Sequence, residues 1–277
     1  PPPTPPTYSS SAASDVYKRQ GEARLQVRGL GAKGNHGLPA LHDIELEVHA
    51  GEIVGVAGVS GNGQTELAEV LGGMRRTSAG SITVDGTELA DRGPGEVMAA
   101  GVGRIPEDRH ASLVLELPVS LNLIMEHIDD FAPGGRLDRA AIESYAEELI
   151  ERYQIKARPG DRVATLSGGN IQKVLLARVL SRDPRVIIVS QPTRGLDVGA
   201  SEYVRTELLE RRADGAAVLL ISEDLDELVS LSDRIVVLYE GRLVGHIEAA
   251  EADPEQLGML MAGRSAAAEL VSEGSAQ

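Results

Sequence analysis

The stretch IVGVAGVSGNGQTELAEVLGG, residues 53–73, decides the fold of this chain. Its first five residues are typical of a buried strand, and the helical segment at residues 65–73 ends in two glycines. Between them, GVSGNGQT has the spacing of a phosphate-binding loop, in which backbone N–H groups and a helix N-terminus bind phosphate. Without a ligand, the same residues would form only a tight strand-to-helix turn.

The loop departs from the phosphate-binding pattern at one position, because Gln64 stands where a lysine is expected. A neutral amide replaces a charge-assisted contact, a loss of about 1–2 kcal/mol of binding free energy. Nucleotide binding should therefore be weakened and not abolished. The residues predicted to bind phosphate are Gly58, Ser60, Gly61, Asn62, Gly63, Gln64 and Thr65.

The composition excludes several classes of protein. The 277 residues are 42% hydrophobic and 25% charged, which is typical of a globular protein with a sizeable core. With 27 basic and 42 acidic residues, the net charge of −15 disfavours nucleic acid as a partner. There is no cysteine, which excludes disulfides and thiolate metal sites, and the six histidines lack metal-ligand spacing. No apolar run approaches the roughly 18 residues of a membrane span.

Short β-branched runs alternate with helical segments, which predicts an α/β domain over residues 21–263. Residues 114–164 have helical spacing without a strong strand, so we expect a helical subdomain over residues 114–182. The small polar residues 264–277 are expected to form a flexible tail. The predicted strands are residues 44–48, 53–57, 81–86, 186–190, 216–222 and 234–241.

Residues 10–20, SSAASDVYKRQ, are the translation of a DNA sequence that resembles a transposase-type sequencing-library adapter. We therefore interpret residues 1–20 as a disordered artefact, and a genuine Pro/Ser-rich leader is the alternative. On the first interpretation the natural protein continues upstream of a junction near Gly21, and this chain is the C-terminal piece of a longer one. Sequencing the source gene across the junction distinguishes the two interpretations.

A second motif, TLSGGNIQKVLLARVL at residues 165–180, precedes VIIVSQPTRGLDVGA at residues 186–200. With the phosphate loop, these motifs make residues 21–263 resemble the ATP-binding domains of ABC transporters. The resemblance implies an α/β P-loop NTPase fold with a mixed β core, an antiparallel β edge and a helical signature subdomain. It also implies ATP and Mg²⁺ as cofactors. The signature residues that would meet a nucleotide held by another domain are Ser167, Gly168, Gly169 and Asn170.

The resemblance assigns catalytic roles to positions at which this chain mostly lacks the family's residues. Gln191 replaces the Glu that polarises the attacking water, and Ser190 replaces the Asp that holds the metal. Glu107 replaces a γ-phosphate-sensing Gln, and Glu223 replaces the switch His, whereas Asp197 is retained. Loss of a general base commonly costs about 10²- to 10⁴-fold in rate, so binding should outlast hydrolysis. The predicted magnesium ligands, a weak set, are Thr65, Ser190 and Glu107.

ABC domains work in head-to-tail pairs, in which each site combines one domain's phosphate loop with the other's signature. The resemblance therefore implies the C-terminal half of a two-domain importer ATPase at the cytoplasmic face of the plasma membrane. Its signature would complete the active site of the N-terminal half, and its own site would hydrolyse ATP weakly or not at all. Transmembrane permease subunits, and indirectly a substrate-binding lipoprotein, would be further partners.

Details of the motifs favour nucleosides as the transported substrate. Gln64 in GNGQT and Gln191 in SQPTRGLDVG look more like the nucleoside-importing branch, since sugar-type C-terminal halves tend to keep Asp-Glu-Pro-Thr. Three alternatives stay open: a monosaccharide importer subunit, a self-sufficient soluble ATPase that uses Glu107 or Glu223, and a regulatory module without nucleotide. For stacking on adenine, GAKGNHGLPAL offers only His36 as a planar side chain.

Overall fold

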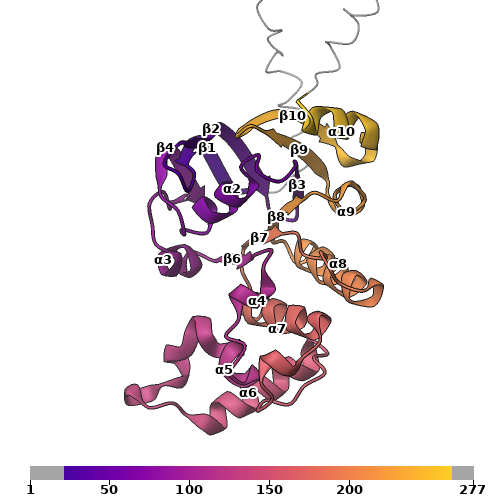
Figure 1. The fold of residues 1–277 in the computed structure, drawn as a ribbon. Coiled ribbons are helices and arrows are strands. Elements are labelled where there is room, and N and C mark those ends of the chain that lie inside the picture. The colour runs from indigo at the N-terminus through magenta and orange to yellow at the C-terminus, as the bar shows by residue number, and fades with distance from the viewer. Residues whose placement is uncertain (1–21, 264–277) are drawn as a thin grey trace, which may run out of the picture.

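The computed structural model describes residues 22–263 and arranges them as two sheets with surrounding helices (Figure 1). One sheet is antiparallel, with strand order β2-β1-β4-β5. Its strands are β1 (Ala23–Lys33), β2 (Pro39–His49), β4 (Thr77–Val84) and β5 (Thr87–Glu88). The other sheet, ordered β10-β9-β3-β8-β7-β6, is parallel except at its β10 edge. Its strands are β3 (Ile53–Ala57), β6 (Val102–Ile105), β7 (Val186–Ser190), β8 (Ala217–Ser222), β9 (Arg234–Tyr239) and β10 (Arg242–Glu248).

The central strands of the parallel sheet are apolar throughout because both of their faces are covered. Every residue of β3 and β8 is buried, as are the first four residues of β7. Successive side chains point to opposite faces, so Ile53 and Ile187 enter one core cluster and Val54 and Ile188 enter the other. The parallel register also brings the carboxyl ends of the strands to one edge, where ligands bind in open α/β sheets.

Helices occupy the chain between β6 and β7, and no strand interrupts them in this part of the described residues. In Figure 1 this helical part lies apart from the two sheets, at the bottom of the view. Its elements are α4 (Arg109–Ser112), α5 (Val119–Ile124), η2 (Met125–Phe131), η3 (Pro133–Gly135), α6 (Arg139–Arg152), η4 (Val163–Thr165) and α7 (Gly168–Leu180). The remaining helices are α2 (Gln64–Leu71), α3 (Pro94–Ala99), α8 (Val198–Ala213), α9 (Leu225–Leu231), η5 (Ala249–Glu251) and α10 (Pro254–Met261).

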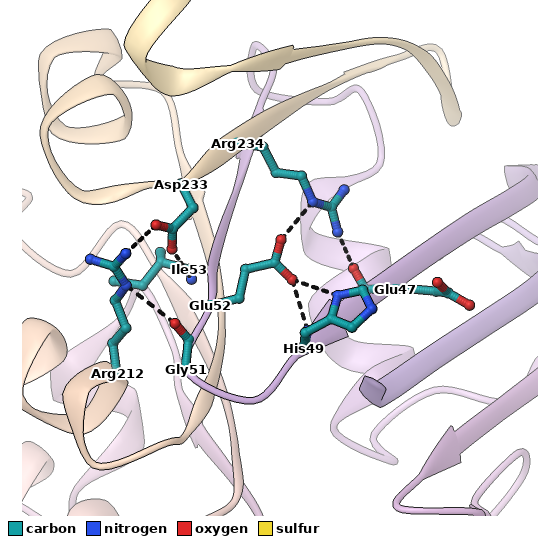
Figure 2. A network of polar contacts seen from close by, with 8 residues as sticks. All are labelled: Glu47, His49, Gly51, Glu52, Ile53, Arg212, Asp233 and Arg234. Atoms are coloured by element: carbon teal, nitrogen blue, oxygen red, sulfur yellow. Dashed lines mark hydrogen bonds and ion pairs between the residues drawn. The ribbon is translucent and has the colours of Figure 1, made fainter. Parts of the chain in front are cut away.

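A buried polar network joins the two sheets at the amino end of β3 (Figure 2). Glu52, only 2% exposed, accepts a hydrogen bond from Arg234 Nε at 2.7 Å. Its other oxygen accepts one from the backbone N–H of His49 at 2.8 Å and lies 3.0 Å from the ring of that residue. Arg234 also donates to the carbonyl of Glu47 in β2. One carboxylate therefore links β9 to the antiparallel sheet.

A second carboxylate, Asp233, extends this network to α8. It accepts a hydrogen bond from the N–H of Ile53 at 2.8 Å and pairs with the guanidinium of Arg212, whose Nε donates to the carbonyl of Gly51. The amino end of β3 is thereby held from three directions, while its carboxyl end leads into the glycine-rich loop.

The strands predicted at residues 53–57 and 186–190 are confirmed residue for residue. The strand predicted at residues 81–86 begins earlier, at Thr77, and ends before a turn at Asp85 and Gly86, which both have positive φ. Within the described residues no helix combines the length and apolar content that crossing a membrane requires. The predictions for residues 1–20 and 264–277 lie outside the residues that the structure describes.

Candidate functional site

A cavity of about 900 Å³ lies beside the glycine-rich loop, at the carboxyl ends of β6, β7 and β8. The predicted residues that line it are Ser60, Gly61, Gln64, Thr65, Glu107, Ser190, Gln191 and Glu223. The predicted residues that do not line it are Gly58, Asn62, Gly63, Ser167, Gly168, Gly169, Asn170 and Asp197. The structure thus brings part of the loop together with Glu107, Ser190, Gln191 and Glu223, the four positions predicted to be degenerate, and it places the signature elsewhere.

The glycine-rich loop is shaped by close approaches that only glycine permits. A Cβ atom at Gly58 would lie 2.6 Å from Nε2 of Gln64 and 2.8 Å from the carbonyl of Leu238. Gly63 has a φ of 107°, which glycine adopts without strain, and it caps α2 without a side chain. The N–H groups in the first turn of α2 therefore receive no side-chain cap and can bind an anion.

Whether this loop fits nucleotide phosphates can be judged from the hydrogen-bonding state of the Gln64 side chain. This side chain is 9% exposed, and neither Nε2 nor Oε1 has a hydrogen-bond partner within residues 22–263. An unpaired buried polar group costs about 1–3 kcal/mol, a cost that a phosphate oxygen accepting from Nε2 would reduce. Thr65 adds a hydroxyl-bearing side chain to the same wall. The loop therefore fits a phosphate chain.

The predicted magnesium ligands form an incomplete set. No group of three or more His, Cys, Asp or Glu side chains among residues 22–263 could hold a metal ion. Thr65, Ser190 and Glu107 all line the cavity, but Glu107 forms an ion pair with Arg194. Magnesium commonly takes one or two carboxylates together with phosphate and water oxygens. These residues fit a metal only when a nucleotide supplies most of its ligands.

Gln191 directly follows β7, in a strained turn that is hydrogen-bonded to the end of β8. Its φ of 47° lies in the left-handed region, which costs a non-glycine residue about 1–3 kcal/mol and recurs at functional sites. Its N–H donates to the carbonyl of Ile221 at 2.8 Å, and its Oε1 accepts from the N–H of Glu223 at 3.4 Å. Two of the predicted positions are thus hydrogen-bonded to each other.

Glu227, which the sequence did not single out, lies beneath this turn and is 1% exposed. One of its oxygens accepts a hydrogen bond from the hydroxyl of Thr193, and the other accepts from the hydroxyl of Ser222, both at 2.7 Å. The carboxylate therefore ties the turn after β7 to the end of β8. An acidic residue inside the apolar pattern LDELVSL was the signal that could have revealed it.

Replacing Glu227 with Leu should lower the free energy of unfolding by about 1–3 kcal/mol, because the hydroxyls of Thr193 and Ser222 lose their acceptor. Urea unfolding followed by circular dichroism measures the change. Asp226→Ala is the matched control, since Asp226 is the preceding residue in α9 and is exposed. Equal effects of the two substitutions would contradict the assigned role of Glu227.

The signature residues are held by local capping. Ser167 caps α7, and its hydroxyl accepts a hydrogen bond from Nδ2 of Asn170 at 2.9 Å. Asn170 Oδ1 accepts from the N–H of Lys156 at 2.8 Å. Asp197 caps α8 and accepts from the N–H of Ala200 at 2.9 Å. The capped starts of both helices lie outside the residues that line the cavity of this chain.

Two arginines were also missed by the sequence reasoning. Arg109 donates to the carbonyl of Arg194 at 2.8 Å and to that of Gly195 at 3.4 Å, and it follows the ion-paired Glu107 by two residues. The segment after β6 is therefore tied twice to the turn after β7.

His36, proposed above for adenine, is exposed in the loop between β1 and β2 and does not line the cavity.

Comparisons with known proteins agree with this architecture. A family profile described as ABC transporter matches residues 41–194, more than half of the chain. The chain is 45% identical over 249 residues to a glucose import ATP-binding protein of Haloferax volcanii, covering 88% of this chain and 45% of that protein. It is 41% identical over 244 residues to a guanosine import ATP-binding protein of Bacillus subtilis, covering 86% and 48%.

A solved ATP-binding subunit of an ABC transporter superposes with a TM-score of 0.67 at 27% identity, covering 90% of this chain and 98% of that one. The predicted α/β fold of the ABC ATPase type is thereby confirmed. The chain spans about half the length of the curated relatives it matches. From the matched profile, these relatives and this fold, we conclude that the chain belongs to the ABC transporter family, as one of its ATP-binding domains.

Proposed function

We propose that this chain binds Mg-ATP in the cavity beside the glycine-rich loop and serves as the C-terminal ATP-binding half of an importer. The observation that carries the proposal is the buried, unpartnered amide of Gln64 in a loop whose N–H groups have no side-chain cap. The N–H groups of α2 hold the phosphates, and Nε2 of Gln64 donates to one of them. The hydroxyl of Thr65 is a ligand for the magnesium ion, which neutralises phosphate charge when bound.

Hydrolysis at this site is slow because Ser190 and Gln191, at the positions of the family's two acids, can orient a water molecule but cannot accept its proton. Gln191 lines the cavity at the position where the family has its catalytic Glu, and its amide is not a base. Ser190 offers a neutral hydroxyl where the family has a carboxylate. The expected state is a bound nucleotide with little turnover.

The partner is a second ATP-binding half, whose active site this chain completes. Two observations support this pairing: Ser167 and the start of α7 lie outside the cavity of this chain, and the curated relatives are about twice its length. The N-terminus of α7 presents its partial positive charge to a nucleotide on the other half. Permease subunits at the cytoplasmic face of the membrane, and indirectly a substrate-binding lipoprotein, complete the transporter.

Nucleosides are the proposed transported substrate. Gln64 and Gln191 follow the nucleoside-importing pattern, and the guanosine import protein is among the relatives. Monosaccharides are the second candidate, because the glucose import protein is 45% identical to this chain. Uptake of labelled guanosine and of labelled glucose by cells with and without the gene decides between them.

Isothermal titration calorimetry with this chain tests the nucleotide site. We expect the unaltered chain to bind Mg-ATP, and Thr65→Val to weaken that binding about tenfold by removing one ligand of the magnesium ion. Binding of ATP in the presence of EDTA should change much less. Thr206→Val is the control, since Thr206 is exposed on α8 and its hydroxyl donates to the carbonyl of Glu202 in the same helix. Absence of binding at millimolar Mg-ATP would exclude the proposed function.

A further inference from the structure

The glycine-rich loop of the proposed phosphate site lacks the lysine expected at position 64. Gln64 is neutral, and Glu107 and Glu223 add negative charge to the same cavity wall. A nucleoside triphosphate brings several further negative charges, and like charges at close range disfavour binding. A basic side chain in the cavity would offset this charge together with the magnesium ion proposed above. The arginines that line the cavity are Arg104, Arg109, Arg178 and Arg194.

Two of these guanidinium groups lie far from the loop or are committed elsewhere. Arg104 packs against Gly72, at the carboxyl end of α2, and eight helical residues place that end about 12 Å from the loop. Arg178 lies in the last turn of α7, and its Nε is 3.1 Å from the carboxylate of Glu126. Burial lowers the pKa of both arginines, opposed in each case by a nearby glutamate. Neither is placed to meet a phosphate chain.

Arg109 is also occupied, because it donates to two backbone carbonyls, those of Arg194 and Gly195. These hydrogen bonds hold the backbone of the turn after β7, and the N–H of Arg194 donates to the carbonyl of Gln191 at 3.2 Å. Both the N–H and the carbonyl of Arg194 are therefore hydrogen-bonded. Arg194 lies three residues after Gln191, which replaces the residue that polarises the attacking water.

The side chain of Arg194, in contrast, is free to move. It is 61% exposed, and its ion-pair partner, the carboxylate of Glu107, is 46% exposed. Exposed ion pairs contribute only about 0–1 kcal/mol, so exchanging Glu107 for another anion carries a small energetic penalty. A planar guanidinium is also well suited to bidentate contact with phosphate oxygens.

We propose that Arg194 is the phosphate-binding cation of this site and that it moves from Glu107 to the terminal phosphate of a bound nucleoside triphosphate. This inference rests on the proposed nucleotide site. Glu107 then acts as a competitor that holds Arg194 while the site is empty. The exchange makes binding selective for the triphosphate, because a diphosphate leaves Arg194 on Glu107.

Calorimetric titration of this chain with Mg-ATP and with Mg-ADP tests the proposal. Arg194→Gln should weaken ATP binding about ten- to a hundredfold, as expected for loss of a charge-assisted hydrogen bond, and change ADP binding less than about threefold. Glu107→Gln should tighten ATP binding, because Arg194 loses its competitor. Arg194→Lys, which keeps the charge without the planar fork, should lie between the unaltered chain and Arg194→Gln.

Arg162→Gln is the matched control, since Arg162 is an exposed arginine that pairs with Glu116 and does not line the cavity. Thermal unfolding should show that Arg194→Gln is folded, because the lost pair is exposed. Equal weakening of ATP and ADP, or no change in ATP binding, would overturn the role of Arg194 while leaving the nucleotide site intact. Failure of the unaltered chain to bind either nucleotide would overturn the site itself, and the inference with it.

Discussion

The double variant Ser190→Asp, Gln191→Glu should hydrolyse bound ATP about 10²- to 10⁴-fold faster than the unaltered site, because it regains a general base and a carboxylate for the metal. Glutamate has the length and branching of glutamine, so the new carboxylate should occupy the place of the Gln191 amide. The turn that positions it is already held by the hydrogen bond from the N–H of Gln191 to Ile221. Only the chemical nature of the side chain changes.

The measurement is a rapid-quench single-turnover assay in the proposed two-half protein. The catalytic carboxylate of the other half is neutralised there, so that only this site can react. Ser190→Asn is the control, since it matches the size of aspartate without the charge. It should leave the rate near that of the unaltered site.

Two outcomes would contradict this account of the site. If the unaltered site already turns over as fast as the double variant, the missing acids are supplied from elsewhere. Glu107→Gln and Glu223→Gln would then show which of the two carboxylates that line the cavity acts as the base. If the double variant binds ATP and gains no rate, the loss of these acids is not what limits the reaction.

The strands that could be predicted from sequence are those whose signal is local. Residues 53–57 and 186–190 are continuous apolar runs bounded by turn residues, and both form strands with those limits. Strand β6, in contrast, has only four residues, with Gly103 and Arg104 among them, and it exists because it pairs with β7. Pairing across 84 residues of chain, from Val102 to Val186, leaves no local pattern.

The same distinction applies to the candidate site. The glycine-rich loop and the end of β7 are each a contiguous motif, which makes each visible in the sequence, and residues of both line one cavity. The ion pair of Glu107 and Arg194 joins residues 87 positions apart, and Glu227 acts by reaching Thr193 across 34 positions. Such contacts follow from the packing of β6, β7 and β8, which a single sequence does not reveal.

Substitution of Glu52 with Gln should lower the free energy of unfolding by about 3–5 kcal/mol, a large share of the 5–15 kcal/mol typical of a domain. The substitution leaves the guanidinium of Arg234, which is 8% exposed, without its carboxylate partner. It also places an amide N–H₂ or a single carbonyl where two oxygens accepted hydrogen bonds from Arg234 and His49. Urea unfolding at low temperature measures the loss while the native state is still populated.

Glu116→Gln is the matched control, because Glu116 also pairs with an arginine, Arg162, but their side chains are 80% and 69% exposed. Its effect should stay below about 1 kcal/mol, since solvent screens an exposed pair. Similar losses in the two variants would mean that burial does not determine the contribution of the Glu52 pair.

The position of Glu52 makes a further distinction possible, because Glu52 precedes β3 whereas the glycine-rich loop follows that strand. Its network holds the amino end of the strand against β9, β2 and α8, and none of the residues drawn in Figure 2 lines the cavity. The loss should therefore appear in the free energy of unfolding, while the folded fraction of Glu52→Gln binds Mg-ATP with unchanged affinity. Weakened binding at full stability would contradict this separation and would mean that the sheet junction controls the conformation of the loop.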